Sequence, residues 1–246
     1  MLDAVQGVQF GYILCGIIWS IALGFAAGNY ACSLVHRLPR GRLILDKTPY
    51  CGNCGTLLQV RDLFPVVSAL LLKHRCRYCN QPYPTSHTWT ELLVGLLFVL
   101  AFLKYSFSEQ YILVVTMGTF LITLAAIHAN EGMVMWRILI CVIVPGMLFR
   151  TLQDAGLYGF FEGALYAGLL GLLIKRKDIK KVGHIYVPPK LAILMAAGGL
   201  CVGLNQLMPF LVLFFLFYAA STLSRRIPIT VPFGLALIIP VLYPIG

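Results

Sequence analysis

The sequence predicts an all-α membrane protein with about eight transmembrane helices and a small zinc-binding module between the first two. The first observation is composition, because 59% of the 246 residues are hydrophobic and only 11% are charged. A soluble domain carries about a quarter charged residues. The second observation is a series of apolar runs, and the third is two Cys-x-x-Cys pairs in one long basic loop. We expect a first transmembrane helix in residues 1–35, the zinc module in residues 36–90 and a seven-helix membrane domain in residues 91–246.

The first apolar run covers residues 10–31 and is long enough to cross a hydrocarbon layer of about 30 Å. The run also contains small residues that would allow close helix packing: Gly16, Gly24, Ala26, Ala27 and Gly28. The residues before the run contain Asp3 and no Lys or Arg, and no small-residue cleavage site follows the run. These features differ from those of a cleavable signal peptide, so we expect the run to remain as a membrane helix.

Four cysteines in the following loop have the spacing of a structural zinc site: Cys51, Cys54, Cys76 and Cys79. Two such pairs are typical of one tetrahedral zinc ion, and four thiolates leave no open position for metal catalysis. A pair of disulfides is the alternative. It is less favoured because a bridge between cysteines three positions apart is strained and the basic loop indicates the reducing side of the membrane. Between the pairs, we expect residues 62–72 to form a short helix that does not span the membrane.

Seven further apolar runs follow the loop, at residues 91–107, 111–129, 133–149, 157–174, 190–207, 209–223 and 229–245. Their short connections favour antiparallel neighbours in one helical bundle. The last run is the least secure span, since it contains several prolines.

The basic residues predict the topology. The net charge is +10, and nearly all Lys and Arg fall in residues 36–90, 175–190 and 225–226. Only Lys104 and Arg150 lie near the opposite side. The positive-inside rule therefore places the zinc module in the cytoplasm and both chain termini outside. Basic residues beside apolar runs indicate contact with anionic lipid, and we expect no nucleic-acid partner.

Several motifs resemble the bacterial prepilin peptidase family, also called type IV leader peptidases. Residues 28–30 and 35–41 resemble the exit of that family's first helix, and the two cysteine pairs match. Residues 61–66, 90–98 and 231–236 resemble the insert between the pairs, the start of the second helix and the final helix.

The resemblance implies an enzyme of the bacterial inner (cytoplasmic) membrane that cleaves the basic leader of type IV pilins and pseudopilins. It also implies, for many members, methylation of the new N-terminus with S-adenosylmethionine. Proteolysis in this family uses two aspartates close together near the cytoplasmic face, one ionised and one protonated.

The chain departs from this pattern at both catalytic positions. His128, in the Ala-Ile-His stretch at residues 126–128, occupies the first aspartate position, and Pro188 occupies the second. Proline has no acid–base chemistry, so we expect no catalytic pair. Glu131 is the best substitute among the nine acidic residues, because it lies one helical turn after His128 and a His/Glu pair can activate water. The favoured interpretation is that both are polar residues at a helix end, since both motifs are altered together.

The sequence therefore favours a prepilin peptidase-like membrane protein that lacks the aspartyl pair. It would bind the N-terminal segments of pilins or pseudopilins within a type IV pilus, a type II secretion system or a related assembly. Zinc is the expected structural cofactor, and S-adenosylmethionine would bind only if methyl transfer is retained. One alternative is an active leader peptidase or N-methyltransferase with a substituted site. Another is a scaffold whose zinc module docks a protein of a secretion or competence complex.

Overall fold

The computed structural model describes residues 2–41, 54–57, 75–81, 86–152, 157–176, 191–202, 206–224 and 230–242. Within these ranges the regular structure is helical and contains no β-strand. The chain divides into two compact units, Met1–Ser106 and Phe107–Gly246, each with its own internal packing.

The first unit contains two long helices, α1 (Leu2–Arg37) and α3 (Ser86–Tyr105), and a short 3-10 helix, η1 (Leu38–Arg40). The 3-10 helix continues α1 and tolerates Pro39 in its first turn, where a backbone N–H has no intrahelical partner. Gly41 ends it with a left-handed φ of 65°, and the Gly41 N–H donates to the Leu38 carbonyl at 3.1 Å. Helix α1 thus stops at the start of the cysteine loop.

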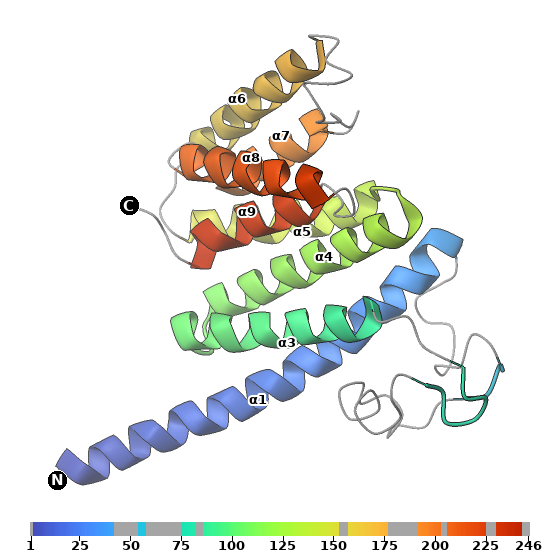
Figure 1. The fold of residues 1–246 in the computed structure, drawn as a ribbon. Helices are drawn as coiled ribbons and strands as arrows, with labels where there is room; N and C mark the ends of the chain where they lie inside the picture. Colours follow the sequence, from blue (N-terminus) through green and yellow to red (C-terminus); the bar gives the residue numbers. More distant parts are fainter. Residues whose placement is uncertain are drawn as a thin grey trace. The chain divides into compact units, whose positions relative to one another are not determined.

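Helices α1 and α3 lie side by side in the first unit (Figure 1) and run antiparallel. Gly16 lies against Phe102, whereas Gly28, three turns later in α1, lies against Glu91. At Gly24 the two backbones approach closely, because a Cβ added there would lie 2.8 Å from the Gly95 Cα. Small residues at this interface let two backbones pack directly, which is how membrane helices commonly associate.

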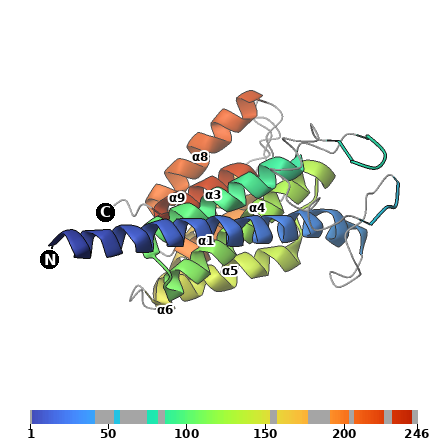
Figure 2. The same ribbon diagram turned by 90° about the horizontal axis from the view of Figure 1, so that it is seen from below.

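The second unit is a bundle of six helices among its described residues. They are α4 (Glu109–Glu131), α5 (Trp136–Thr151), α6 (Leu157–Arg176), α7 (Leu191–Val202), α8 (Leu207–Ser224) and α9 (Thr230–Leu242). Helix α7 contacts α5, α6, α8 and α9. The two views of the ribbon show α8 and α9 as neighbours (Figure 2), and Phe210 of α8 packs edge-to-face on Phe233 of α9 with ring centroids 6.3 Å apart.

Helix α4 has defined ends that the hydropathy pattern does not show. Ser108 is the N-cap, and its hydroxyl accepts a hydrogen bond from the Tyr111 N–H at 3.3 Å. At the other end Gly132 takes a left-handed φ of 66°, and the Gly132 N–H donates to the His128 carbonyl at 3.0 Å. His128 and Glu131 therefore lie in the last turn of α4.

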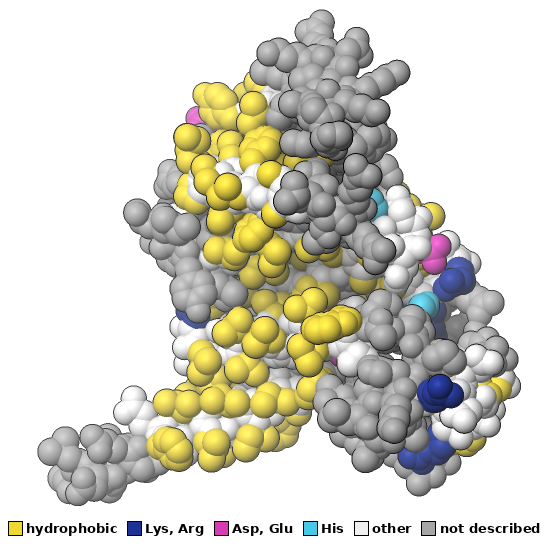
Figure 3. All heavy atoms as spheres, in the orientation of Figure 1, with side chains coloured by type: hydrophobic (Ala, Val, Ile, Leu, Met, Phe, Trp, Pro, Cys, Tyr) yellow, Lys and Arg dark blue, Asp and Glu magenta, His cyan; other side chains and the backbone are white. Residues whose placement is uncertain are grey.

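Three segments among the described residues are long and apolar enough to cross a membrane: Gln9–Arg40, Thr88–Tyr105 and Glu109–Glu131. Exposed hydrophobic side chains cover α1, as expected for a lipid-facing surface (Figure 3). These findings agree with an all-helical membrane protein. The total of about eight spans, the predicted domain boundaries and the cytoplasmic placement of the cysteine module stay predictions.

Each predicted apolar run coincides with a helix, but several boundaries differ. Helix α1 begins before and ends after the predicted residues 10–31, and α3 begins five residues before position 91. Hydropathy marks the apolar part of a helix, whereas helical hydrogen bonding continues into polar residues at its ends. The predicted short helix at residues 62–72 lies outside the described residues.

Candidate functional site

The structure brings together three of the four cysteines predicted to bind zinc. The Sγ atoms of Cys54, Cys76 and Cys79 all lie within 4.8 Å of one another, and each cysteine carries a thiol rather than a disulfide. Cys76 is buried, Cys79 is partly exposed and Cys54 is exposed. Cys51, the fourth predicted ligand, lies outside the described residues.

The residue after Cys54 and the residue after Cys79 have the same backbone conformation. Gly55 and Asn80 each follow the second cysteine of a pair, and both have a left-handed φ, 68° and 58° respectively. In the turn that contains Cys76 and Cys79, the Asn80 N–H donates to the Cys76 carbonyl at 2.9 Å, and the Cys76 N–H donates to the Gln81 carbonyl at 2.8 Å. Glycine and asparagine are the residues that adopt this conformation most readily. These hydrogen bonds hold Cys76 and Cys79 in one tight turn, and Gly55 repeats the left-handed conformation directly after Cys54.

The cysteine cluster fits a zinc ion. With Zn–S bonds of about 2.3 Å, tetrahedral geometry separates neighbouring sulfur atoms by roughly 3.8 Å, which lies within the limit observed for the three thiols. Thiolates are soft ligands that select zinc over magnesium or calcium. With a fourth thiolate, the ion would have no open position, so its contribution would be to hold the two turns together rather than to activate water.

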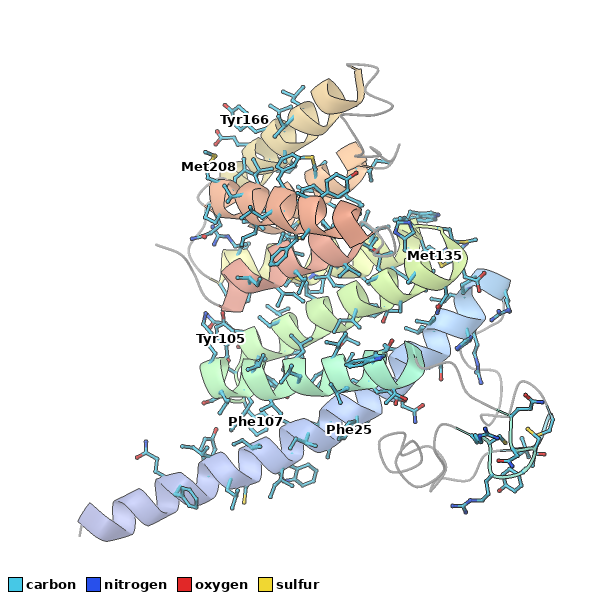
Figure 4. All side chains as sticks on the ribbon, viewed as in Figure 1. Phe25, Tyr105, Phe107, Met135, Tyr166 and Met208 are labelled. Atoms are coloured by element: carbon cyan, nitrogen blue, oxygen red, sulfur yellow. The ribbon has the colours of Figure 1, made fainter. Side chains whose placement is uncertain are left out.

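His128 lies at the junction between α4 and α9. Its Nδ1 is 3.2 Å from the Thr230 Oγ1, and which of the two atoms donates depends on the histidine tautomer. Thr230 is the first residue of α9 and is only 1% exposed, whereas His128 is partly exposed. The imidazole thus connects the C-terminal turn of α4 to the N-terminal turn of α9. Figure 4 labels Met135, the residue that immediately precedes α5, in the connection that follows this turn of α4.

Glu131 occupies the predicted position next to His128, one helical turn along α4, and its side chain is exposed. Pro188 and the residues around it lie outside the described residues, so the predicted pairing of positions 128 and 188 stays a prediction. The Thr230 hydroxyl lies within hydrogen-bond distance of the His128 ring.

Comparison with known proteins gives the family. A family model described as the bacterial peptidase A24 N-terminal domain matches residues 22–105, a range that includes the cysteine cluster and lies in the first unit. The type 4 prepilin-like proteins leader peptide-processing enzyme of Escherichia coli is 30% identical over 254 residues, covering 95% of this chain and 88% of that protein. The chain belongs to the prepilin leader peptidase family.

Two further family members align with this chain over part of their length. The prepilin leader peptidase/N-methyltransferase of Myxococcus xanthus is 28% identical over 162 residues, covering 63% of this chain and 46% of that protein. The protein of the same name from Pseudomonas aeruginosa is 25% identical over 202 residues, covering 70% of this chain and 65% of that protein. This chain therefore aligns with about half of the M. xanthus protein. No solved structure matches the chain.

Family membership confirms the resemblance drawn from the short motifs, but sequence reasoning missed three residues of interest. Asn80 could have been found by aligning the two cysteine pairs, since it stands where Gly55 stands in the first pair. Glu91 is a buried acidic residue, and the signal for it is its position as an acid at the start of the apolar run at residues 91–107. Thr230, directly before the motif at residues 231–236, carries no local signal that points to His128.

Proposed function

We propose that this member of the prepilin leader peptidase family lacks aspartyl protease activity and binds the N-terminal segments of pilin-like proteins during assembly of a type IV pilus, a type II secretion system or a related machine. The observation that carries the proposal is the contact between His128 and Thr230 at 3.2 Å. It sets an imidazole and an alcohol where the family resemblance implies a catalytic aspartate.

The chemistry of aspartyl proteolysis explains why this substitution matters. The reaction needs two carboxyl groups so close that one stays protonated while the other is ionised and activates water. A histidine hydrogen-bonded to a threonine cannot share a proton in that way. Pro188, at the other catalytic position implied by the resemblance, has no titratable group at all.

Topology and metal complete the proposal. The basic loop at residues 36–90 faces the cytoplasm, where anionic lipid attracts its Lys and Arg side chains, and both chain termini lie outside. One zinc ion joins Cys51 to the cluster of Cys54, Cys76 and Cys79. The close approach of the three described thiols and the matching left-handed conformations of Gly55 and Asn80 support this metal site.

A second candidate function is N-methyl transfer without proteolysis. The family model matches residues 22–105, in the unit that contains the cysteine cluster, and several relatives are named as combined leader peptidase/N-methyltransferases. This function would require S-adenosylmethionine. Incubating membranes that contain the protein with a mature pilin and labelled S-adenosylmethionine tests it, and label transfer that requires the protein would establish it.

A leader-cleavage assay tests the main proposal. Membranes containing this protein are mixed with a prepilin, and the E. coli leader peptide-processing enzyme serves as the active control. We expect no cleavage, together with co-purification of tagged pilin. Co-purification of other assembly proteins without pilin would favour the scaffold alternative.

Cleavage of the prepilin in that assay would be the contrary outcome, and three variants show whether it depends on His128 or Glu131. Cleavage that is abolished by His128→Ala or Glu131→Ala would show a working substituted site and would overturn the proposal. Glu109→Ala is the matched control, because Glu109 is an exposed glutamate at the opposite end of the same helix.

A further inference from the structure

Glu91 is an acidic residue buried between α1 and α3. It lies in the apolar segment Thr88–Tyr105, and only 3% of its surface is exposed. Its Oε2 atom is buried and has no hydrogen-bond partner in the part of the chain that the structure describes. A buried carboxyl group without a partner is costly, and an acidic residue inside a membrane segment generally marks a functional site.

Helix α1 is shaped to accept this side chain. A Cβ added at Gly28 would lie 2.9 Å from the Glu91 Cα and 3.2 Å from its Cγ, so any larger residue would displace Glu91. Cys32, one turn further along α1, is also buried. Among the described residues, no Lys, Arg or His donates to Oε2.

We propose that Glu91 binds a positively charged group of a peptide segment held in the membrane, either a Lys or Arg side chain or an N-terminal ammonium. A cation with N–H donors satisfies both the charge and the open oxygen of the carboxylate. A divalent metal ion fits poorly, because one carboxylate and one thiol provide too few ligands. The inference rests on the proposed peptide-binding function and names the chemistry by which this unit recognises its ligand.

The test measures peptide affinity of the full-length protein in a nonionic detergent, so that no lipid ammonium or phosphate competes. The probes are fluorescent apolar helical peptides of about twenty residues. One has an acetylated N-terminus and a single lysine near it, a second has norleucine at that position, a third has norleucine and a free N-terminus, and a fourth has glutamate. We expect the lysine or the free-amine peptide to bind about tenfold more tightly than the acetylated norleucine peptide, and the glutamate peptide to bind least tightly.

Glu91→Gln should remove this preference and leave the affinity for the norleucine peptide unchanged, because the change deletes charge at nearly constant shape. Glu162→Gln, which neutralises an exposed glutamate on α6, is the matched control and should keep the preference. If Glu91→Gln does not fold, the ranking of the four peptides on the unaltered protein still decides the question.

The outcomes separate this inference from the function on which it rests. Equal binding of all four peptides would overturn the role of Glu91 and leave peptide binding standing. The role of Glu91 would also be overturned by a Glu91→Gln variant that loses thermal stability yet keeps the lysine preference. The carboxyl group would then bind a group inside the chain rather than the peptide. Failure of the unaltered protein to bind any peptide would overturn both proposals. The source of the cation follows from whether the lysine or the free-amine peptide binds more tightly.

Discussion

Three threonine hydroxyls on α4 donate hydrogen bonds to the backbone of their own helix. Thr116 and Thr119 donate to the carbonyls of the residues four positions earlier at 2.6 Å, and Thr123 does so at 2.7 Å. In hydrocarbon this bonding avoids the cost of an unpaired hydroxyl. His128 differs because its partner, Thr230, comes from another helix. The hydrogen bond of His128 therefore requires that α4 and α9 pack together, whereas the threonine hydrogen bonds could form in any apolar helix.

The cysteine cluster gives a prediction at the scale of single residues. Cys54→Ser, Cys76→Ser and Cys79→Ser should each reduce bound zinc from about one ion per chain to nearly none, because serine is a poor zinc ligand and a structural site needs all its thiolates. Cys51→Ser should do the same if Cys51 is the fourth ligand. Elemental analysis of the purified protein measures the ratio.

Cys15→Ser is the control for the zinc measurement. Cys15 is an exposed cysteine on α1, outside the cluster, and its substitution should leave the zinc content unchanged. Full zinc content in a double variant of Cys76 and Cys79 would show that the metal is not held by these thiols.

Residue spacing predicted the convergence of Cys54, Cys76 and Cys79 better than it predicted the surroundings of each thiol. Two Cys-x-x-Cys pairs are enough to expect convergence, because a closed tetrahedral site needs four ligands on short turns. The burial of Cys76 and the exposure of Cys54 depend on how the loop folds back on itself, which no spacing encodes. The same limit applies to His128, whose neighbour Thr230 is remote in sequence.

At the scale of helices, close packing depends on glycines at defined positions. Gly24 and Gly28 lie on one face of α1. On α3, Gly95 lies against Gly24 and Glu91 lies against Gly28. The ring of Phe25, labelled in Figure 4, fills the adjacent space against Gly95. In the second unit Gly146 of α5 brings that helix against Cys201 of α7. Both units therefore use small residues where two helices cross.

The glycine at position 24 gives a prediction for this packing. Gly24→Ala should lower the free energy of unfolding by about 1–3 kcal/mol, because the added methyl group would meet the α3 backbone at Gly95. Gly11→Ala adds the same group to the same helix at a position with no atom within 4 Å. This control should be neutral or more stable by up to about 1 kcal/mol, from helix propensity. Unfolding in mixed detergent micelles measures both, and equal losses in the two variants would contradict direct packing at Gly24.

Helix positions were predictable from apolar length, whereas helix ends were not. The cap at Ser108 and the left-handed Gly132 define α4 by hydrogen bonds that a hydropathy pattern cannot report. The last helix was the least secure prediction because of its prolines, yet α9 forms from Thr230 to Leu242. Pro232 falls in its first turn, where the missing N–H has no intrahelical partner in any helix.

At the scale of the whole molecule, charged side chains mark the ends of helices in each unit. Basic side chains gather at the end of the first unit that carries the cysteine loop (Figure 3). In the second unit, α4 has 23 residues and is about 33 Å long, close to the thickness of a hydrocarbon layer of about 30 Å. Its two terminal glutamates, Glu109 and Glu131, are both exposed and should therefore face opposite sides of the membrane.

This arrangement predicts the sidedness of α4. If the basic loops are cytoplasmic, a cysteine introduced as Glu109→Cys should react with a membrane-impermeant thiol reagent in intact cells, because that end of α4 lies outside. Glu131→Cys should react only after the cells are permeabilised, and Lys177→Cys should behave like Glu131→Cys. The unaltered protein, with its native cysteines, gives the background. Because the first two sites are exposed ends of one helix, accessibility alone does not explain a difference between them. Reaction of Glu131→Cys or Lys177→Cys in intact cells would refute a cytoplasmic position for this end of α4 and for the loop that contains Lys177.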